Sequence, residues 1–162
     1  MKPVTVQIEI NCPPQVAWEY MVNAEHNPEW LPNMRSCTWI TDPPIRAGSR
    51  YDQVARFLGK DVRTSFEVTA LDDGRLITIT SLPGSSFPLT ITREVSPIGD
   101  RRCLVKETAG GEPGGFFAVA EAPMRALVRR NITRAYRGLK QLLESRVEIG
   151  EILRSRCIVT RS

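Results

Sequence analysis

Residues 4–24 read VTVQIEINCPPQVAWEYMVNA, and this stretch decides how the fold begins. Apolar and polar residues alternate through residues 4–10, which predicts a strand with one buried face. Pro13 and Pro14 suit the entrance of a helix, and the apolar residues that follow recur at helical spacing. We therefore expect a strand and then a helix over residues 14–24.

The next part of the sequence predicts a second short helix and six more strands. Pro28 and Pro32 bracket Trp30, so this helix can span only a turn or two. Alternating apolar residues and turn signals predict strands at residues 36–41, 48–57, 62–70, 75–81, 87–95 and 102–109, with a turn at residues 97–100. Because their connections are short wherever a turn can be assigned, we expect antiparallel pairing.

A glycine-rich segment at residues 110–115 separates the strands from a C-terminal helix. The helix is indicated by an apolar stripe made of Met124, Val128, Ile132, Ala135, Leu139 and Leu142. We expect it to reach about Glu144, leaving residues 146–162 as a short element, a disordered tail or an oligomer contact. Because the stripe and the apolar sheet face need each other as cover, residues 1–145 should form one α+β domain whose sheet curls around the helix and leaves an apolar cavity.

The composition is that of one ordinary globular domain. The chain has 162 residues, 41% of them hydrophobic and 25% charged, so neither two full domains nor wholesale disorder is expected. No signal-peptide core follows Lys2, and no apolar run approaches the roughly 20 residues of a membrane-spanning helix. The four cysteines form no CxxC pair, which is typical of reduced thiols in a cytoplasmic protein.

The positive charge is concentrated at the C-terminal end. The net charge is +4, but residues 122–162 carry +7, so residues 1–121 carry −3. The helix contributes Arg125, Arg129, Arg130, Arg134 and Arg137. Their spacing of three to five residues predicts a solvated outer face, with anionic lipid or nucleic-acid contact as the alternative. We expect no nucleic-acid partner; peripheral membrane contact and a monomeric or homodimeric state stay open.

The sequence lacks the residues that metal binding, nucleophilic catalysis and phosphate binding require. His26 is the only histidine and ends the first predicted helix, so neither a metal site nor a nucleophilic triad is expected. Residues 110–115 lack the Lys-Ser/Thr of a phosphate loop, and no cofactor is expected. What remains is acid–base or electrostatic chemistry by carboxylates, arginines and hydroxyls that face a cavity.

Arg93 and Glu107 are charged residues on otherwise apolar strand faces. Their strands are joined by a short turn, so any plausible antiparallel register leaves the two residues opposite or diagonal. We predict a partly buried ion pair. It is either a structural pair at the sheet rim or a device that orients a polar group of a ligand.

Residues on facing strands and on the helix should line any space between them. The candidates for the ligand cavity are Trp30, Tyr51, Phe66, Phe87, Ile91, Arg93, Glu107, Met124, Val128 and Asn131. Among these, Arg93, Glu107 and Tyr51 are the candidate catalytic residues. Trp18, Trp30 and Trp39 fill the core or line the pocket, and large aromatic residues do the former more often.

The sequence resembles the START-like, or Bet v 1-like, helix-grip superfamily, especially its polyketide cyclase/dehydrase and lipid-transport branch. The resemblance rests on VTVQIEINCPPQVAW at residues 4–18, NPEWLP at 27–32, GSRY at 48–51 and LKQLLE at 139–144. It covers roughly residues 3–145 and implies a seven-stranded curved antiparallel sheet wrapped around the C-terminal helix, with two short helices after the first strand. It implies no catalytic motif, since the superfamily includes carriers, hormone binders and cyclases.

Three functions follow as hypotheses. The first is a carrier or sensor that binds a small hydrophobic molecule, such as a lipid, an isoprenoid or a polyketide-like compound. The second is a cyclase or dehydratase in which Glu107, Arg93 or Tyr51 moves protons. The third is a regulatory module that contacts a partner, a membrane surface or nucleic acid through the basic C-terminal helix and tail. The sequence does not decide whether the protein is an enzyme.

Overall fold

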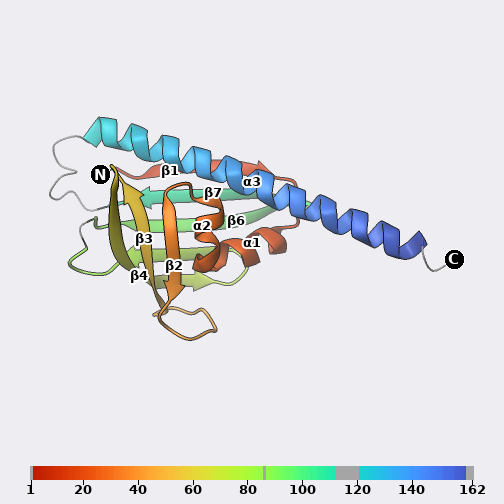
Figure 1. Ribbon diagram of the computed structural model, residues 1–162, viewed down its shortest axis with the longest axis horizontal. Helices are drawn as coiled ribbons and strands as arrows, with labels where there is room; N and C mark the ends of the chain where they lie inside the picture. The colour runs from red at the N-terminus through yellow and green to blue at the C-terminus, as the bar shows by residue number, and fades with distance from the viewer. Residues whose placement is uncertain (1, 86, 112–120, 160–162) are drawn as a thin grey trace.

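The computed structural model describes residues 2–85, 87–111 and 121–159 (Figure 1). Its elements in chain order are β1 (Val4–Ile10), α1 (Pro14–Val22), the 3₁₀ helix η1 (Ala24–His26), α2 (Asn27–Trp30), β2 (Met34–Trp39), β3 (Arg50–Phe57), β4 (Lys60–Asp72), β5 (Leu76–Ser81), β6 (Thr90–Gly99), β7 (Arg102–Gly110) and α3 (Glu121–Val159). Within the described residues, seven strands form one antiparallel sheet in the order β1-β7-β6-β5-β4-β3-β2. The predicted fold class is confirmed.

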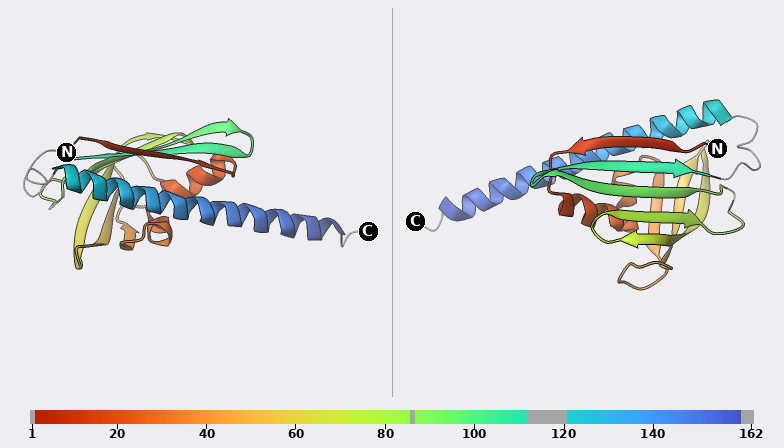
Figure 2. Two further views of the ribbon diagram at one scale, coloured as in Figure 1. Left: turned by 90° about the horizontal axis from the view of Figure 1, so that it is seen from above. Right: turned by 180° about the vertical axis from the view of Figure 1, so that it is seen from behind.

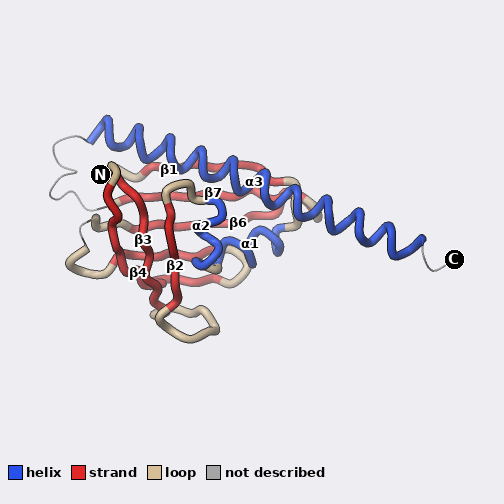
Figure 3. The backbone as a smooth tube through the Cα atoms, viewed as in Figure 1, coloured by secondary structure: helices blue, strands red, loops and turns tan. Residues whose placement is uncertain are grey.

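The sheet is strongly curved, and the helices lie on its concave side. The view from above in Figure 2 shows β3 and β4 bending around toward α1 and α2, while α3 runs the length of the sheet. The tube in Figure 3 shows that α3 then continues past the edge of the sheet. This arrangement places the apolar sheet face opposite the N-terminal half of α3, where a pocket can form.

The N-terminal elements follow the sequence pattern closely. Exposure alternates along β1, from the buried Val4 to the buried Ile10, as its period-two sequence predicts. α1 begins at Pro14, whose missing N–H costs nothing at a helix start. The helix ends at Val22 rather than residue 24 because Asn23 is extended, and the Asn23 side chain then caps η1 by accepting a hydrogen bond from the Glu25 amide.

The sixth strand is shifted relative to the sequence prediction. β6 begins at Thr90, so Phe87 and Leu89 precede it; Pro88 between them has no N–H for a ladder bond. β6 also continues to Gly99 through a bulge, where Pro97 pairs with Cys103, so the predicted turn at residues 97–100 is mostly strand.

The predicted end of the last helix near Glu144 is wrong, because α3 continues to Val159. Residues 145–159 contain no proline and only one glycine, Gly150, so nothing in their sequence stops the helix. The placement of a domain boundary at residue 145 stays a prediction. In the described part of the chain, no helix combines the length and the apolarity needed to cross a bilayer.

The stripe of α3 packs on the sheet as predicted, with one shift. Ala135, Tyr136, Leu139 and Leu143 are buried, whereas the predicted Leu142 is only half-buried. The opposite face carries exposed arginines at positions 129, 130, 134 and 137, as expected, while Arg125 is partly buried. The basic residues therefore mostly form a solvated helix face.

Candidate functional site

A pocket of about 240 Å³ lies between the sheet and the N-terminal half of α3. Its walls come from β3, β4, the segment before β6, β7 and α3. The lining residues are Gln53, Ala55, Phe57, Val62, Thr64, Phe66, Phe87, Pro88, Leu89, Ile91, Glu107, Ala109, Gly111, Met124, Val128 and Ile132. The described part of the lining is thus apolar apart from the Gln53 and Thr64 side chains and one charged residue, Glu107.

The structure brings many of the predicted cavity residues together in this pocket. They are Phe66, Phe87, Ile91, Glu107, Met124 and Val128. Sequence analysis missed Gln53 and Thr64, which are partners in the β3–β4 register. The alternation of side chains along a strand could have identified them, because Gln53 lies on the same strand face as the predicted cavity residue Tyr51, and Thr64 on the same face as Phe66.

Trp30, Tyr51, Arg93 and Asn131 are not brought into this pocket. Tyr51 lies further along the sheet, stacked on Phe66 at 5.5 Å between ring centroids. Asn131 is next to the pocket residue Ile132, but one residue of helix turns a side chain by about 100°. Trp30 and Arg93 are buried outside the pocket lining and belong to a polar cluster that includes Glu107.

The centre of this cluster is the pair formed by Arg93 and Glu107. The two residues are direct partners in the β6–β7 register, and Arg93 Nε donates to Glu107 Oε2 at 2.9 Å. Arg93 is 6% exposed and Glu107 is 4% exposed. The predicted ion pair is confirmed, and it lies on two interior strands, β6 and β7, rather than at the rim of the sheet.

Three helical residues complete the cluster. From α3, the Tyr136 hydroxyl donates to the same Glu107 Oε2 at 2.7 Å. From α2, the Asn27 side-chain oxygen accepts from Arg93 at 3.2 Å, and the Arg93 guanidinium lies 5.0 Å from the Trp30 ring centroid. Strands and helices that are distant in sequence therefore meet at one buried charge pair.

The cluster fixes the protonation of Tyr136 and Arg93. Burial raises the pKa of Tyr136 well above its usual value and the nearby Glu107 carboxylate raises it further, so the hydroxyl stays a donor. Burial alone would lower the pKa of Arg93, but the charge of Glu107 raises it, so the guanidinium stays charged. The Trp30 indole N–H is buried and has no acceptor among the described residues.

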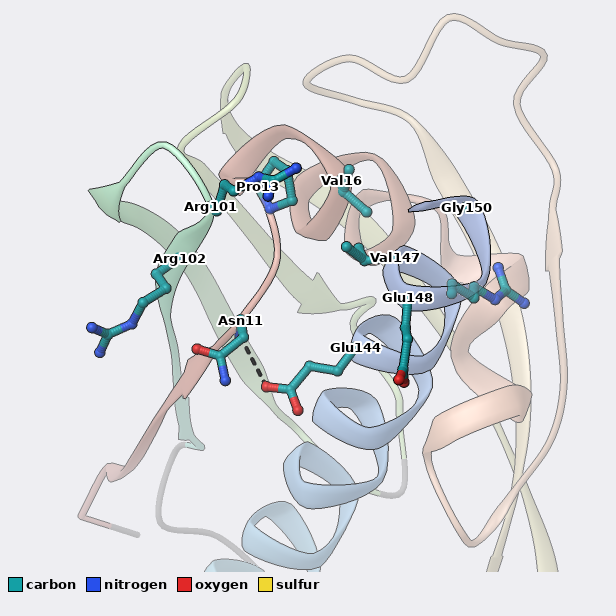
Figure 4. A pocket seen from close by; sticks show the side chains of 10 residues that line it. Asn11, Pro13, Val16, Arg101, Arg102, Glu144, Val147, Glu148 and Gly150 are labelled. Carbon is teal, nitrogen blue, oxygen red and sulfur yellow. Dashed lines mark hydrogen bonds between the residues drawn. The ribbon is translucent and has the colours of Figure 1, made fainter. Parts of the chain in front are cut away.

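A second, more polar pocket of about 640 Å³ lies where α3 leaves the sheet (Figure 4). Its lining residues are Asn11, Pro13, Val16, Arg101, Arg102, Glu144, Arg146, Val147, Glu148 and Gly150. In Figure 4 the Glu144 side chain reaches toward Asn11, whose backbone N–H donates to it at 2.9 Å. Glu144 also accepts from Lys140 at 2.6 Å, so these contacts tie the end of β1 to α3.

The Glu144 contacts predict a pH-dependent contribution to stability. Partial burial would raise the pKa of Glu144, but the hydrogen bonds from Lys140 and from the Asn11 amide lower it. A lowered folded-state pKa gives stability that is present above the ordinary value of 4.5 and lost as the pH falls through the lower value.

The variant Glu144→Gln should therefore be less stable than the natural protein at pH 7 by up to about 1 kcal/mol. The difference should shrink below pH 4.5, as urea denaturation at a series of pH values would measure. Glu148→Gln is the matched control, since Glu148 is exposed on the same helix. A difference that persisted undiminished in acid would contradict the assignment.

The histidine, the other two tryptophans and the described cysteines make contacts that stabilise the fold. His26 ends η1, where its Nδ1 lies 2.9 Å from the Tyr20 carbonyl oxygen and its ring stacks on Tyr20. Trp18 is buried and donates to Asp73 at 2.9 Å, and Trp39 donates to Asn23 at 2.9 Å. Cys12, Cys37 and Cys103 are buried free thiols, while the side chain of Cys157 lies outside the described residues.

Fold and pocket together define the class of this protein. A curved antiparallel sheet closing on one long C-terminal helix, with two short helices after the first strand, is the helix-grip fold. The profile of the family described as polyketide cyclase/dehydrase and lipid transport matches residues 1–144, and the chain belongs to this family. The resemblance found in the sequence is thereby confirmed. No curated protein has a matching sequence.

Solved structures share the fold at low sequence identity. TTHA0849 from Thermus thermophilus is 22% identical with a TM-score of 0.74, covering 88% of this chain and 97% of that one. The Zhui aromatase/cyclase from a Streptomyces species is 14% identical with a TM-score of 0.72, covering 90% and 95%. A START superfamily protein from Mycobacterium smegmatis is 16% identical with a TM-score of 0.66, covering 90% and 97%. At these identities the likeness concerns the fold.

Proposed function

We propose that the protein binds a small hydrophobic ligand in the pocket between the sheet and α3 and serves as its carrier or sensor. The observation that carries this proposal is a pocket of about 240 Å³ whose described lining residues are almost all apolar and include one charged side chain, Glu107. Small-molecule sites typically combine an apolar wall with a few polar groups that orient the ligand. The volume favours a compact lipid, isoprenoid or polyketide-like molecule, and the family description includes lipid transport.

Native mass spectrometry of the purified protein tests this proposal. The expected result is an added mass on the folded protein that disappears on denaturation, together with a small hydrophobic compound in the denatured extract. Protein that carries no compound, and that also takes up none when incubated with a panel of small hydrophobic molecules, would contradict the proposal.

Filling the pocket should abolish this binding. Val128 lines the pocket from α3, so Val128→Phe would occupy the space that the ligand needs. We expect the affinity for any captured compound to fall at least about tenfold, measured by isothermal titration calorimetry. Leu127→Phe is the matched control, because Leu127 is an exposed neighbour on the same helix. Equal loss in both variants would argue against this pocket as the binding site.

A cyclase or dehydratase is the second candidate function, and the position of Glu107 is the observation that favours it. A carboxylate at the wall of an apolar pocket can accept a proton from a bound substrate. Arg93 and Tyr51, the other predicted catalytic residues, do not line the pocket. Incubation with a captured compound should then yield a cyclised product or one that has lost water, and turnover that survives Glu107→Gln would contradict this role.

A further inference from the structure

At its polar end, the pocket offers a ligand a hydrogen-bond acceptor, the carboxylate of Glu107. Among the described residues that line it, Glu107 is the one charged residue. Its Oε2 atom already accepts from Arg93 at 2.9 Å and from Tyr136 at 2.7 Å. No hydrogen bond to the other oxygen, Oε1, is found from any residue that the structure describes. A carboxylate oxygen can only accept, so Oε1 is an acceptor that no donor of the described residues occupies.

The positive partner of Glu107 does not face the ligand. Arg93 is absent from the pocket lining and is held from behind by Glu107 and by Asn27 of α2. The buried pair is neutral as a whole, but the charge nearest to a ligand is negative. A ligand carboxylate or phosphate at this position would meet a like charge in an apolar surrounding, where such repulsion is poorly screened.

A ligand that carries a hydroxyl group can supply the hydrogen bond that Glu107 accepts at this position. The hydroxyl donates to Glu107 and adds no charge, and hydrogen bonds to charged acceptors are stronger than neutral ones. An ammonium group would also donate, but it would have to lose much more hydration to enter the pocket. The rest of the ligand would contact apolar walls, including the ring pair Phe57 and Phe87, whose centroids are 5.3 Å apart.

We propose that the pocket selects a neutral apolar molecule through a hydroxyl group that donates to Glu107, and that it rejects the corresponding carboxylic acid. This inference rests on the proposed function, since it assumes that the pocket binds a ligand. It narrows the ligand to alcohols and phenols and excludes free fatty acids.

A matched set of probes tests the inference on the natural protein at pH 7. The set is 2-naphthol, which is uncharged, 2-naphthoate, which is ionised, and 2-methylnaphthalene, which cannot donate. We expect 2-naphthol to bind at least about tenfold more tightly than either of the other two, measured by calorimetry. Geraniol and geranic acid form a second pair with an aliphatic body, and the alcohol should again bind more tightly. The two pairs together distinguish phenolic from isoprenoid-like alcohols as the better ligands.

Variants show whether Glu107 is the cause of the preference. Glu107→Gln keeps an acceptor for Arg93 and Tyr136 but removes the charge, so 2-naphthoate should gain affinity and the preference should vanish. Glu94→Gln is the matched control, because Glu94 forms an ion pair with Lys106 across the same two strands but does not line the pocket, so this variant should leave the preference intact. If Glu107→Gln does not fold, the probe series on the natural protein still decides whether the pocket prefers the hydroxyl over the carboxylate.

The outcomes separate this inference from the proposed function. Binding of 2-naphthoate as tight as that of 2-naphthol would overturn the inference while the pocket remained a ligand site. Binding of the probes that Val128→Phe left unchanged would overturn the inference together with the proposed function. No binding of any probe would overturn the inference, and the proposed function would fall with it only if native mass spectrometry also found no bound compound.

Discussion

Glu107→Leu is expected to lower the free energy of unfolding by about 3–5 kcal/mol, because it leaves a buried charge without its partner. Arg93 is only 6% exposed, and Glu107 supplies its ion-pair contact at 2.9 Å. The burial that makes the pair costly to break also prevents water from replacing the lost carboxylate. Urea denaturation followed by circular dichroism would measure the change.

The double variant Arg93→Met with Glu107→Leu is the control for this prediction. Replacing both members of a buried pair with apolar residues is often neutral or stabilising, so the double variant should recover most of the stability. Some loss should remain because Asn27 and Tyr136 also lose hydrogen-bond partners. A double variant no more stable than Glu107→Leu alone would show that the pair is not the source of the effect.

Leu139→Ala should destabilise the protein by about 2–5 kcal/mol. Leu139 is fully buried where α3 packs on the sheet, and the alanine would leave a cavity there. Leu127→Ala on the same helix removes the same atoms from a side chain that is 36% exposed, and should cost well under half as much. Similar losses in the two variants, again measured by urea denaturation, would contradict the packing described for α3.

The Arg93–Glu107 contact could be predicted because it depends on two local properties. Strand parity places each charge on an apolar face, and the short turn after Gly99 restricts the register of β6 and β7. The contributions of Tyr136 and Asn27 could not be found in the same way. They lie on helices far away in sequence, and only the packing of those helices on the sheet brings them to the pair.

The extent of the pocket could not be predicted from the sequence pattern either. Periodicity identifies which residues share a face but gives no position along the strand at which the helix stops filling the space. Tyr51 and Phe66 illustrate this limit: they are register partners, yet only Phe66 lines the pocket. The end of α3 was missed for a different reason, since residues 145–159 lack the strong apolar stripe that marks the first part of the helix.

The position of β1 has a consequence for synthesis on the ribosome. Its sheet partner among the described residues is β7, and the paired threonines Thr5 and Thr108 are 103 residues apart. β2 to β6 can pair with their sequence neighbours as they emerge, whereas β1 must wait with an unpaired edge until β7 has been made. Closing so long a loop raises the contact order and slows folding. We therefore expect closure of the sheet by β1 to be the late step, and α3, which follows β7 in the chain, to dock only after β7 has been made.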